Sequence, residues 1–201
     1  MLKQCTSKNV LAGLLLAAGF VCAPIAQAAL EDLGNGVIAD TDLGIAWLAD
    51  ANYSETSGYN TNGIMTWSAA NNWVNQLNAG GHSDWRLPTT AEFSHLFSDE
   101  LEGVKGFDIY GTHNNANFAL FSNIKTTIAG TGLFYWTGTP QGDADTHSTF
   151  SFANGRDFSD NKDVGHYAMA VAPIPEPETY AMLLAGLGLV GFIARHRKQI
   201  S

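Results

Sequence analysis

The sequence predicts an α+β fold with a mixed, mostly antiparallel sheet and two short helices. Three observations support this prediction. Short apolar runs separated by turn residues occur at both ends of the middle region, two stretches between them have helical spacing, and hydrophobic segments at both termini are typical of transport signals. The 201 residues therefore leave room for one domain, expected at 29–172.

Short strands are expected at the start of this domain. The stretch NGVIADTDLGIAWLADANY places Val37 and Ile38, then Ile45, Trp47 and Leu48, in apolar runs separated by polar turn residues. Short apolar runs bounded by turns are typical of strands.

Strands are also expected toward the end of the domain. Residues 132–139, GLFYWTGT, form an aromatic run, and STFSFANGRDF alternates Phe150 with Phe152 before Asn154 and Gly155. The dipeptide Asn-Gly is favoured in tight hairpin turns. HYAMAVA then alternates large residues with alanines, which predicts a closing strand.

Two helices are predicted between these strands. In MTWSAANNWVNQLNAGG, apolar residues recur at helical spacing, with Thr66 as the N-cap and the pair Gly80 and Gly81 as the stop. In SDWRLPTTAEFSHLF, Thr89 and Glu92 have the spacing of a capping box, which predicts a short second helix.

The N-terminus predicts a secretory signal peptide at 1–28. Two lysines precede an apolar run over 10–26, and Ala26 and Ala28 form the A-x-A pattern that signal peptidase cleaves. A lipoprotein signal at Cys22 is the alternative, disfavoured because a valine stands where a small residue is wanted.

Removal of the signal peptide would leave a domain without cysteines and with a negative net charge. Both cysteines, Cys5 and Cys22, lie within the signal peptide, so the mature protein has no disulfide, cysteine nucleophile or thiolate metal ligand. Residues 29–172 carry seventeen acidic and five basic side chains, a formal net charge of −12. Because such a surface repels phosphate backbones, nucleic acid is excluded as a partner.

The C-terminus predicts a single transmembrane helix at about 179–194, sixteen residues without a charge. At about 1.5 Å per residue this helix is roughly 24 Å long, marginal for a hydrocarbon core of about 30 Å. The basic tail over 195–198, with Arg195, Arg197 and Lys198, would lie on the cytoplasmic side.

The prolines of APIPEPE favour an extended, exposed backbone just before that helix. The order of Pro175, Glu176 and Pro177, an apolar helix and an arginine-rich end resembles the PEP-CTERM sorting signal of Gram-negative bacteria, over 173–201. The resemblance implies cleavage by the membrane enzyme exosortase, in organisms that make exopolysaccharide. The implied route is export, transient anchoring in the inner membrane, and delivery to the cell surface or extracellular matrix.

A second resemblance extends from about residue 40 to 172. It is carried by a six-residue motif and a later aromatic pair: Asp84, Trp85, Arg86, Leu87, Pro88 and Thr89, then Tyr135 and Trp136. These residues resemble the Lcl_C family, named for the C-terminal domain of a bacterial collagen-like adhesin. The resemblance implies a domain related to the C-type-lectin-like folds on an exported protein. The adhesin is linked to sulfated glycans, but five cations against seventeen acids do not make an anion-binding face here.

Arg86 has two interpretations. It could stack on Trp85 and bind a carboxylate or a sugar, or it could pair with Asp84, Glu92 or a carbonyl group and fix the turn. The structural role is favoured, because cations beside a Trp-Leu-Pro core are usually satisfied internally.

No catalytic residue, cofactor or metal site is predicted. The five tryptophans all lie in apolar patterns, so core positions are expected for most of them. Acid pairs such as Asp40 with Asp42 and Asp143 with Asp145 do not follow an EF-hand, although ligands from separated loops would escape recognition. The histidines are scattered singly, without H-x-x-x-H, and G-x-S-x-G is absent.

The sequence therefore predicts an exported, non-enzymatic protein of the cell surface or of an exopolysaccharide (biofilm) matrix. Adhesion or matrix association is the expected role, with carbohydrate as a candidate ligand. The alternatives are an extracellular enzyme acting on polysaccharide and a structural matrix component without a ligand. Two carboxylates converging in an exposed cleft would favour the enzyme, whereas a shallow aromatic patch would favour binding.

Overall fold

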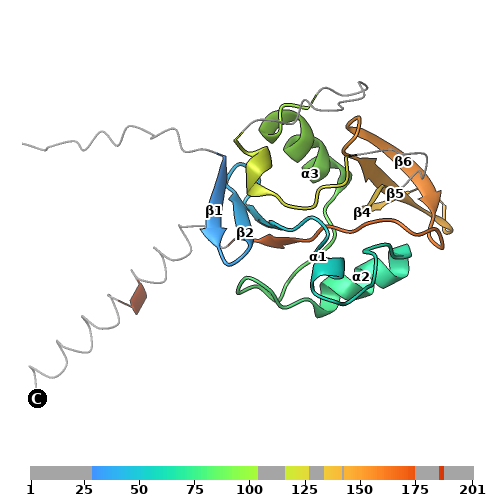
Figure 1. The fold of residues 1–201 in the computed structure, drawn as a ribbon, viewed down its shortest axis with the longest axis horizontal. Helices are drawn as coiled ribbons and strands as arrows, with labels where there is room; N and C mark the ends of the chain where they lie inside the picture. The colour runs from blue at the N-terminus through green and yellow to red at the C-terminus, as the bar shows by residue number, and fades with distance from the viewer. Residues whose placement is uncertain (1–28, 104–115, 127–133, 142, 175–185, 188–201) are drawn as a thin grey trace, which may run out of the picture.

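Two antiparallel sheets organise the chain (Figure 1). The structure, a computed structural model, describes residues 29–103, 116–126, 134–141, 143–174 and 186–187. The first sheet has the order β1-β2-β3-β7 and contains Leu30–Gly34, Val37–Asp40, Ile45–Leu48 and Val171–Pro173. The second has the order β4-β5-β6 and contains Tyr135–Pro140, Thr146–Ser151 and Arg156–Asn161.

The first sheet lies between two helical layers (Figure 1). Because successive side chains of a strand point to opposite faces, β3 sends Ile45 and Trp47 to one face and Ala46 and Leu48 to the other. The first face packs against α3 (Thr90–His95) and the second against α2 (Trp67–Gln76). The central strands β2 and β3 are therefore buried on both sides, and two separate hydrophobic cores result.

The predicted helices form with the predicted caps. The Thr66 side chain accepts a hydrogen bond from the backbone of Ala69 at the start of α2. Thr89 and Glu92 make both bonds of the capping box at the start of α3. The mixed, mostly antiparallel α+β prediction is confirmed. The structure adds three short elements: α1 (Tyr53–Thr56), the π-helix η1 (Leu96–Glu100) and the 3₁₀-helix η2 (Phe118–Leu120).

The segment predicted as the closing strand contacts both sheets in turn. His166 bridges Met65, Tyr167 bridges Tyr135 in parallel, and only Val171–Pro173 joins the first sheet as β7. The alternation noted in the sequence separates the two cores here. The large residues Met169 and Val171 enter the first core, and the intervening alanines enter the second beneath the tryptophans.

Two turn predictions differ in detail from the structure. Ser151 pairs with Arg156, so Asn154 and Gly155 end a four-residue loop instead of forming a two-residue turn. The helix α2 ends at Gln76, before the predicted glycine stop, because Leu77 is already extended. Gly80 and Gly81 instead make a tight turn closed by hydrogen bonds between Ala79 and His82.

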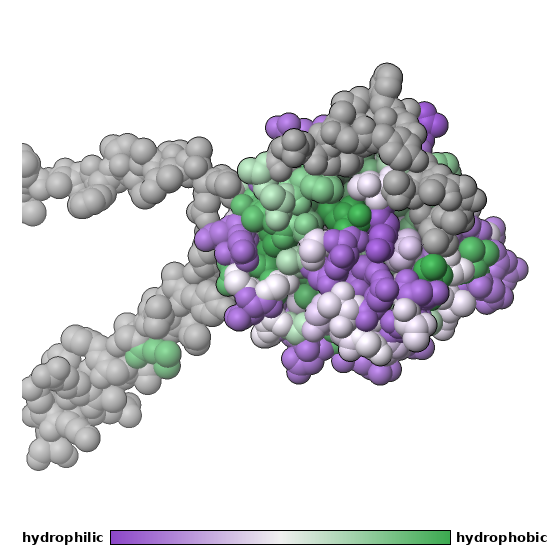
Figure 2. Space-filling view, in the orientation of Figure 1, coloured by the Kyte–Doolittle hydropathy of each residue, from purple (hydrophilic) through white to green (hydrophobic). Residues whose placement is uncertain are grey.

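The described face in Figure 2 is largely hydrophilic, with an apolar area near η2 and the adjoining end of the first sheet. Phe118 and Leu120 of η2 are partly buried against the first core. Within the described ranges, no helix is both long enough and apolar enough to cross a bilayer. The predicted transmembrane helix lies outside the described residues except for Gly186 and Leu187.

Candidate functional site

The motif segment, residues 84–89, joins the two sheets. The backbone of Arg86 exchanges hydrogen bonds of 2.8 and 2.9 Å with Val171 of β7, and the Pro88 carbonyl accepts a 2.8 Å bond from β4. Trp85 and Leu87 are buried in the second core. The segment therefore bonds to one sheet at its start and to the other at its end.

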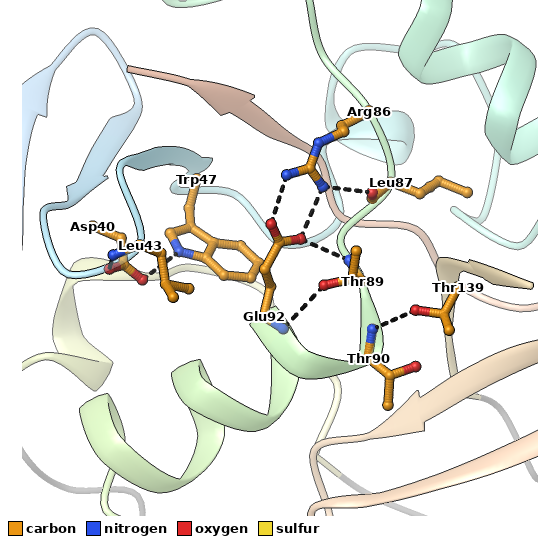
Figure 3. A network of polar contacts seen from close by, with 9 residues as sticks. All are labelled: Asp40, Leu43, Trp47, Arg86, Leu87, Thr89, Thr90, Glu92 and Thr139. Carbon is orange, nitrogen blue, oxygen red and sulfur yellow. Dashed lines mark hydrogen bonds and ion pairs between the residues drawn. The ribbon is translucent and has the colours of Figure 1, made fainter. Parts of the chain in front are cut away.

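Arg86 and Glu92 form a bidentate ion pair at the N-terminus of α3 (Figure 3). The two guanidinium nitrogens donate to the two carboxylate oxygens at 2.8 and 2.6 Å, and one of them also donates to Leu87 O at 3.2 Å. Hydrogen bonding to Glu92 raises the pKa of Arg86. Burial alone would raise the pKa of Glu92, but bonds from Arg86 and Thr89 outweigh burial and hold it below its usual value. The guanidinium is therefore engaged within the protein, as the structural interpretation expected, while Asp84 lies exposed beside His82.

The aromatic pair of the motif lies in the core. Tyr135 and Trp136 of β4 are buried. The indole of Trp136 donates to Met65 O at 2.8 Å, and the Tyr135 hydroxyl accepts from the backbone of Lys125 at 2.9 Å. Burial raises the pKa of Tyr135. Neither ring is open to a ligand.

Asp40 is a fully buried carboxylate at the end of β2. Its oxygens accept bonds from the Leu43 backbone at 3.0 Å and from the Trp47 indole at 3.2 Å (Figure 3). The hydrogen bond to Leu43 closes the turn between β2 and β3, and this turn carries Asp42.

His95, the last residue of α3, lies where this turn meets the end of η1. Its Nδ1 is 2.9 Å from Asp99 Oδ2, and its Nε2 is 3.5 Å from Glu100 Oε1 and 3.8 Å from Asp40 Oδ1. Nε2 is buried and has no hydrogen bond. Glu100 also accepts from the Asn117 amide at 3.1 Å. Burial, and then the charge of Asp40, raises the pKa of Glu100. We call Asp40, Asp42, His95, Asp99 and Glu100 the acid–histidine cluster.

A shallow hollow of about 310 Å³ lies between the end of α1 and the end of α2. We call it the α1–α2 hollow. Its lining residues carry no formal charge: Ser57, Gly58, Tyr59, Trp73, Gln76, Leu77 and Asn78. Tyr59 is 49 % exposed, whereas Trp73 is 2 % exposed and forms part of the second core. The hollow therefore offers an aromatic ring beside neutral amide and hydroxyl groups.

A second hollow of about 210 Å³ adjoins the same two segments. Tyr53 of α1 and Ala79, next to Asn78 in the chain, are among its lining residues, with Asp50 and Ser122 at its other side. Because Asn78 of the first hollow and Ala79 of the second are consecutive in the chain, the two hollows come close together at this point.

Trp67, which is partly buried, is the tryptophan with the most accessible ring in the described chain. It stacks on His147 with centroids 4.3 Å apart, and Lys162 Nζ lies 5.4 Å from its ring centroid. Burial and the charge of Lys162 lower the pKa of His147. Side chains of the protein therefore already pack against the Trp67 ring, whereas Tyr59 is 49 % exposed.

The remaining acid pair of the sequence prediction serves a turn. Asp143 Oδ1 accepts bonds from the backbones of Asp145 and Thr146 and from the Thr146 hydroxyl. Bonding to Thr146 lowers the pKa of Asp143. The carboxylate therefore fixes the start of β5.

The processing residues of the sequence prediction lie outside the described residues. These are Ala26 and Ala28 of the signal peptidase site, Pro175, Glu176 and Pro177 of the sorting motif, and Arg195, Arg197 and Lys198 of the basic tail.

Comparison with protein families supports both resemblances. The family model of the Lcl C-terminal domain matches residues 36–172. The chain belongs to this family. The Lcl C-terminal domain is followed directly by a match to the PEP-CTERM protein-sorting motif over 173–198. This motif is the recognition signal of exosortase, so the protein is exported and carries a C-terminal sorting signal for delivery to the surface. No curated protein matches the chain.

Sequence reasoning missed two groupings in this Lcl C-terminal domain. The sequence pattern presents His95 as a lone histidine, although Asp99 follows it at the i,i+4 spacing of one helical turn; Glu100, at i+5, has no such signal. Tyr59 lies in a polar stretch, and no signal in the sequence places it beside the end of α2.

Proposed function

We propose that the domain is a non-enzymatic surface or matrix protein that binds neutral carbohydrate in the α1–α2 hollow. Within this proposal, the exosortase signal brings the protein to the cell exterior, and the domain then associates with exopolysaccharide. We also propose that the domain is related to the C-type-lectin-like folds. The observation that carries it is the exposed ring of Tyr59 in a hollow lined by uncharged polar groups.

The chemistry of the lining suits a sugar. The faces of sugar rings pack on aromatic rings. The hydroxyl groups of a sugar need both hydrogen-bond donors and hydrogen-bond acceptors from the protein. The amides of Gln76 and Asn78 and the hydroxyl of Ser57 supply both kinds of group. The volume of about 310 Å³ is at the lower end of the usual range for ligand pockets, roughly 300–1,000 Å³. The second hollow extends the path, as a chain of linked sugars requires.

The charge of the domain selects the class of glycan. With seventeen acidic and five basic residues over 29–172, the surface repels sulfated and other polyanionic glycans. Neutral polysaccharide is therefore the expected ligand, in contrast to the sulfated glycans linked to the adhesin that names the family.

Two alternatives remain as different classes of function. An enzyme acting on polysaccharide would need two carboxylates in an accessible cleft. Neither of the two hollows described above is lined by two carboxylates, whereas Asp145 and Asp163 line a third open hollow of about 410 Å³ beside Lys162. A structural matrix component would bind no glycan at all.

The test is a glycan array and calorimetric titration with the full chain, purified in a mild detergent, with and without calcium. Neutral oligosaccharides should bind, without release of reducing ends. Tyr59→Ala should weaken binding about tenfold, which is about 1.4 kcal/mol, whereas Tyr59→Phe keeps the ring and most of the affinity. Phe158→Ala is the matched control, because Phe158 is also exposed, at 38 %, but lies on β6. Equal binding by Tyr59→Ala would refute the hollow as the site, and an array without any bound glycan would favour the structural alternative.

A further inference from the structure

The acid–histidine cluster brings together metal-ligand groups from segments far apart in the chain. Asp42 lies on the turn between β2 and β3, His95 ends α3, and Glu100 ends η1. Each offers one ligand atom, and the three atoms lie within 4.8 Å of one another. This grouping is separate from the α1–α2 hollow and does not depend on carbohydrate binding.

The orientation of His95 is the second observation. An ionised carboxylate only accepts hydrogen bonds, so the 2.9 Å contact with Asp99 Oδ2 requires that His95 Nδ1 carries a proton. In the neutral ring the lone pair is then on Nε2, which is buried and has no hydrogen bond. This nitrogen faces oxygen atoms of Glu100 and Asp40 at 3.5 and 3.8 Å. In the neutral ring, a lone pair directed at carboxylate oxygens is unfavourable, and either a proton on Nε2 or a metal ion bound between these groups relieves the repulsion.

We propose that Asp42, His95 and Glu100 bind a divalent transition-metal ion, with Zn²⁺ as the best fit. In this arrangement Asp99 accepts a hydrogen bond from Nδ1 and so orients the imidazole, as carboxylates commonly do for metal-bound histidines. Asp40 stands close enough to give a fourth ligand after a small movement, and water can fill any open position.

One ligand–ligand distance and the types of ligand favour Zn²⁺ over Ca²⁺. With bonds of about 2.0–2.2 Å, two ligand atoms of a tetrahedral zinc site lie roughly 3.4 Å apart. The 3.5 Å between His95 Nε2 and Glu100 Oε1 is close to that value. Calcium instead takes about six to eight oxygen ligands, and here one of the three groups is an imidazole.

The π-helix explains how His95 and Glu100 come to face the same point. At about 100° per residue, an α-helix would place a side chain five positions later about 140° around the axis. The turn between them is a π turn, shown by the 2.9 Å bond from Leu101 N to Leu96 O. Residues five apart then lie one turn apart on one side. Such turns occur frequently at functional sites.

A bound cation would also offset an electrostatic cost. Asp40 and Glu100 are 0 % and 5 % exposed, so both carboxylates have lost most of their contact with water, and a nearby cation would compensate part of that loss. Asp42 is exposed and gives the ion a path from solvent. The cluster thus has buried ligands, an accessible entrance and a positioned imidazole.

The experiment is a titration of the chelator-treated full chain with ZnCl₂ by calorimetry, with MnCl₂ and CaCl₂ in parallel. We expect one Zn²⁺ per chain and weaker binding of the other two ions. At a free Zn²⁺ concentration a hundred times the Kd, the folding equilibrium should rise about a hundredfold, which for a domain of this size raises the Tm by roughly 5–10 °C.

Variants test the assignment of ligands. Asp42→Ala changes an exposed turn residue that can be altered without loss of the fold, and it should weaken Zn²⁺ binding at least tenfold. Asp84→Ala is the matched control, because it removes an exposed carboxylate whose oxygen is 3.8 Å from a different histidine, His82. Asp99→Asn should weaken binding about 10–100-fold through the orientation of His95.

Nitrogen NMR of the histidine rings gives a readout that does not depend on stability. On addition of Zn²⁺, the Nε2 resonance of His95 should shift while Nδ1 keeps its proton. The proposal is overturned if Zn²⁺ does not bind, if Asp42→Ala and Asp84→Ala bind it equally well, or if the His95 resonances do not change.

Discussion

Substitution of Gly155 by alanine should destabilise the domain more than the same substitution at Gly36, a glycine with positive φ in open space. Gly155 ends the loop between β5 and β6 with φ of +62°, and a Cβ there would lie 2.3 Å from Phe97 Cε1. Real Cβ atoms essentially never approach another atom within 3.0 Å. Phe97 cannot move freely, because it is fully buried and its ring packs edge-on against Phe150 at 6.0 Å.

The magnitude has two parts. A non-glycine residue in the left-handed region costs about 1–2 kcal/mol, and overpacking of a core costs about 1–3 kcal/mol more. Gly155→Ala should therefore lower the free energy of unfolding by about 2–5 kcal/mol. Gly36→Ala is the control: its φ is +76°, but no atom lies within 4 Å of its Cβ position, so only the first part applies.

The assay is urea unfolding of the full chain in a mild detergent, followed by tryptophan fluorescence. The two variants should differ by about 1–3 kcal/mol, or roughly 2–12 °C in Tm. Gly155→Ala combined with Phe97→Leu should recover part of the loss, because the smaller side chain makes room. Equal destabilisation by Gly155→Ala and Gly36→Ala would refute the packing of this loop on η1.

Three further predictions concern ionisable and processing residues. Glu92→Gln should lower the free energy of unfolding by about 1–2 kcal/mol at pH 7, and the control Asp84→Asn should change it very little. Because the pKa of Glu92 is lowered in the folded protein, its contribution to stability is present above about pH 4.5 and is lost as pH falls further. The stability of the Gln variant should therefore depend less on pH in that range. Burial lowers the pKa of His166, whose Nδ1 accepts a hydrogen bond from Phe134 N at 3.2 Å. Because the unfolded chain then takes up this proton more readily than the folded one, the stability of the protein should fall as pH drops below about 6.5. A His166→Gln variant that showed the same pH dependence would contradict this assignment. Glu176→Ala should leave the C-terminal segment uncleaved in the native host, as measured by mass spectrometry of the membrane fraction, and normal release of the variant would remove Glu176 from the recognised motif.

Local patterns in the sequence predicted the elements of the fold well. The caps at Thr66 and Thr89 depend on side chains that bond to backbone within three residues, so their spacing is visible in the chain. The strands at Val37–Asp40 and Ile45–Leu48 were found because they are short apolar runs between turns. Arg86 was expected to pair with one of a few nearby groups, and Glu92 is among them.

The turns show where local reasoning fails. The Asn154 and Gly155 pair predicts a tight hairpin, but the register of β5 and β6 makes the loop four residues long. Likewise, the Gly80 and Gly81 pair does not end α2, because Leu77 leaves the helix before it. In both cases packing between distant segments outweighs the preference of the dipeptide.

By itself, the sequence determined the C-terminal sorting motif, the class of fold, the helix caps and the absence of thiols in the domain. Each of these depends on composition or on residues within a few positions of one another. Only the tertiary structure decided that Tyr59 lies beside the end of α2 and that Asp42 meets His95 and Glu100. Those contacts depend on how α2 and α3 pack on opposite faces of one sheet and on a single π turn, and no local pattern specifies either.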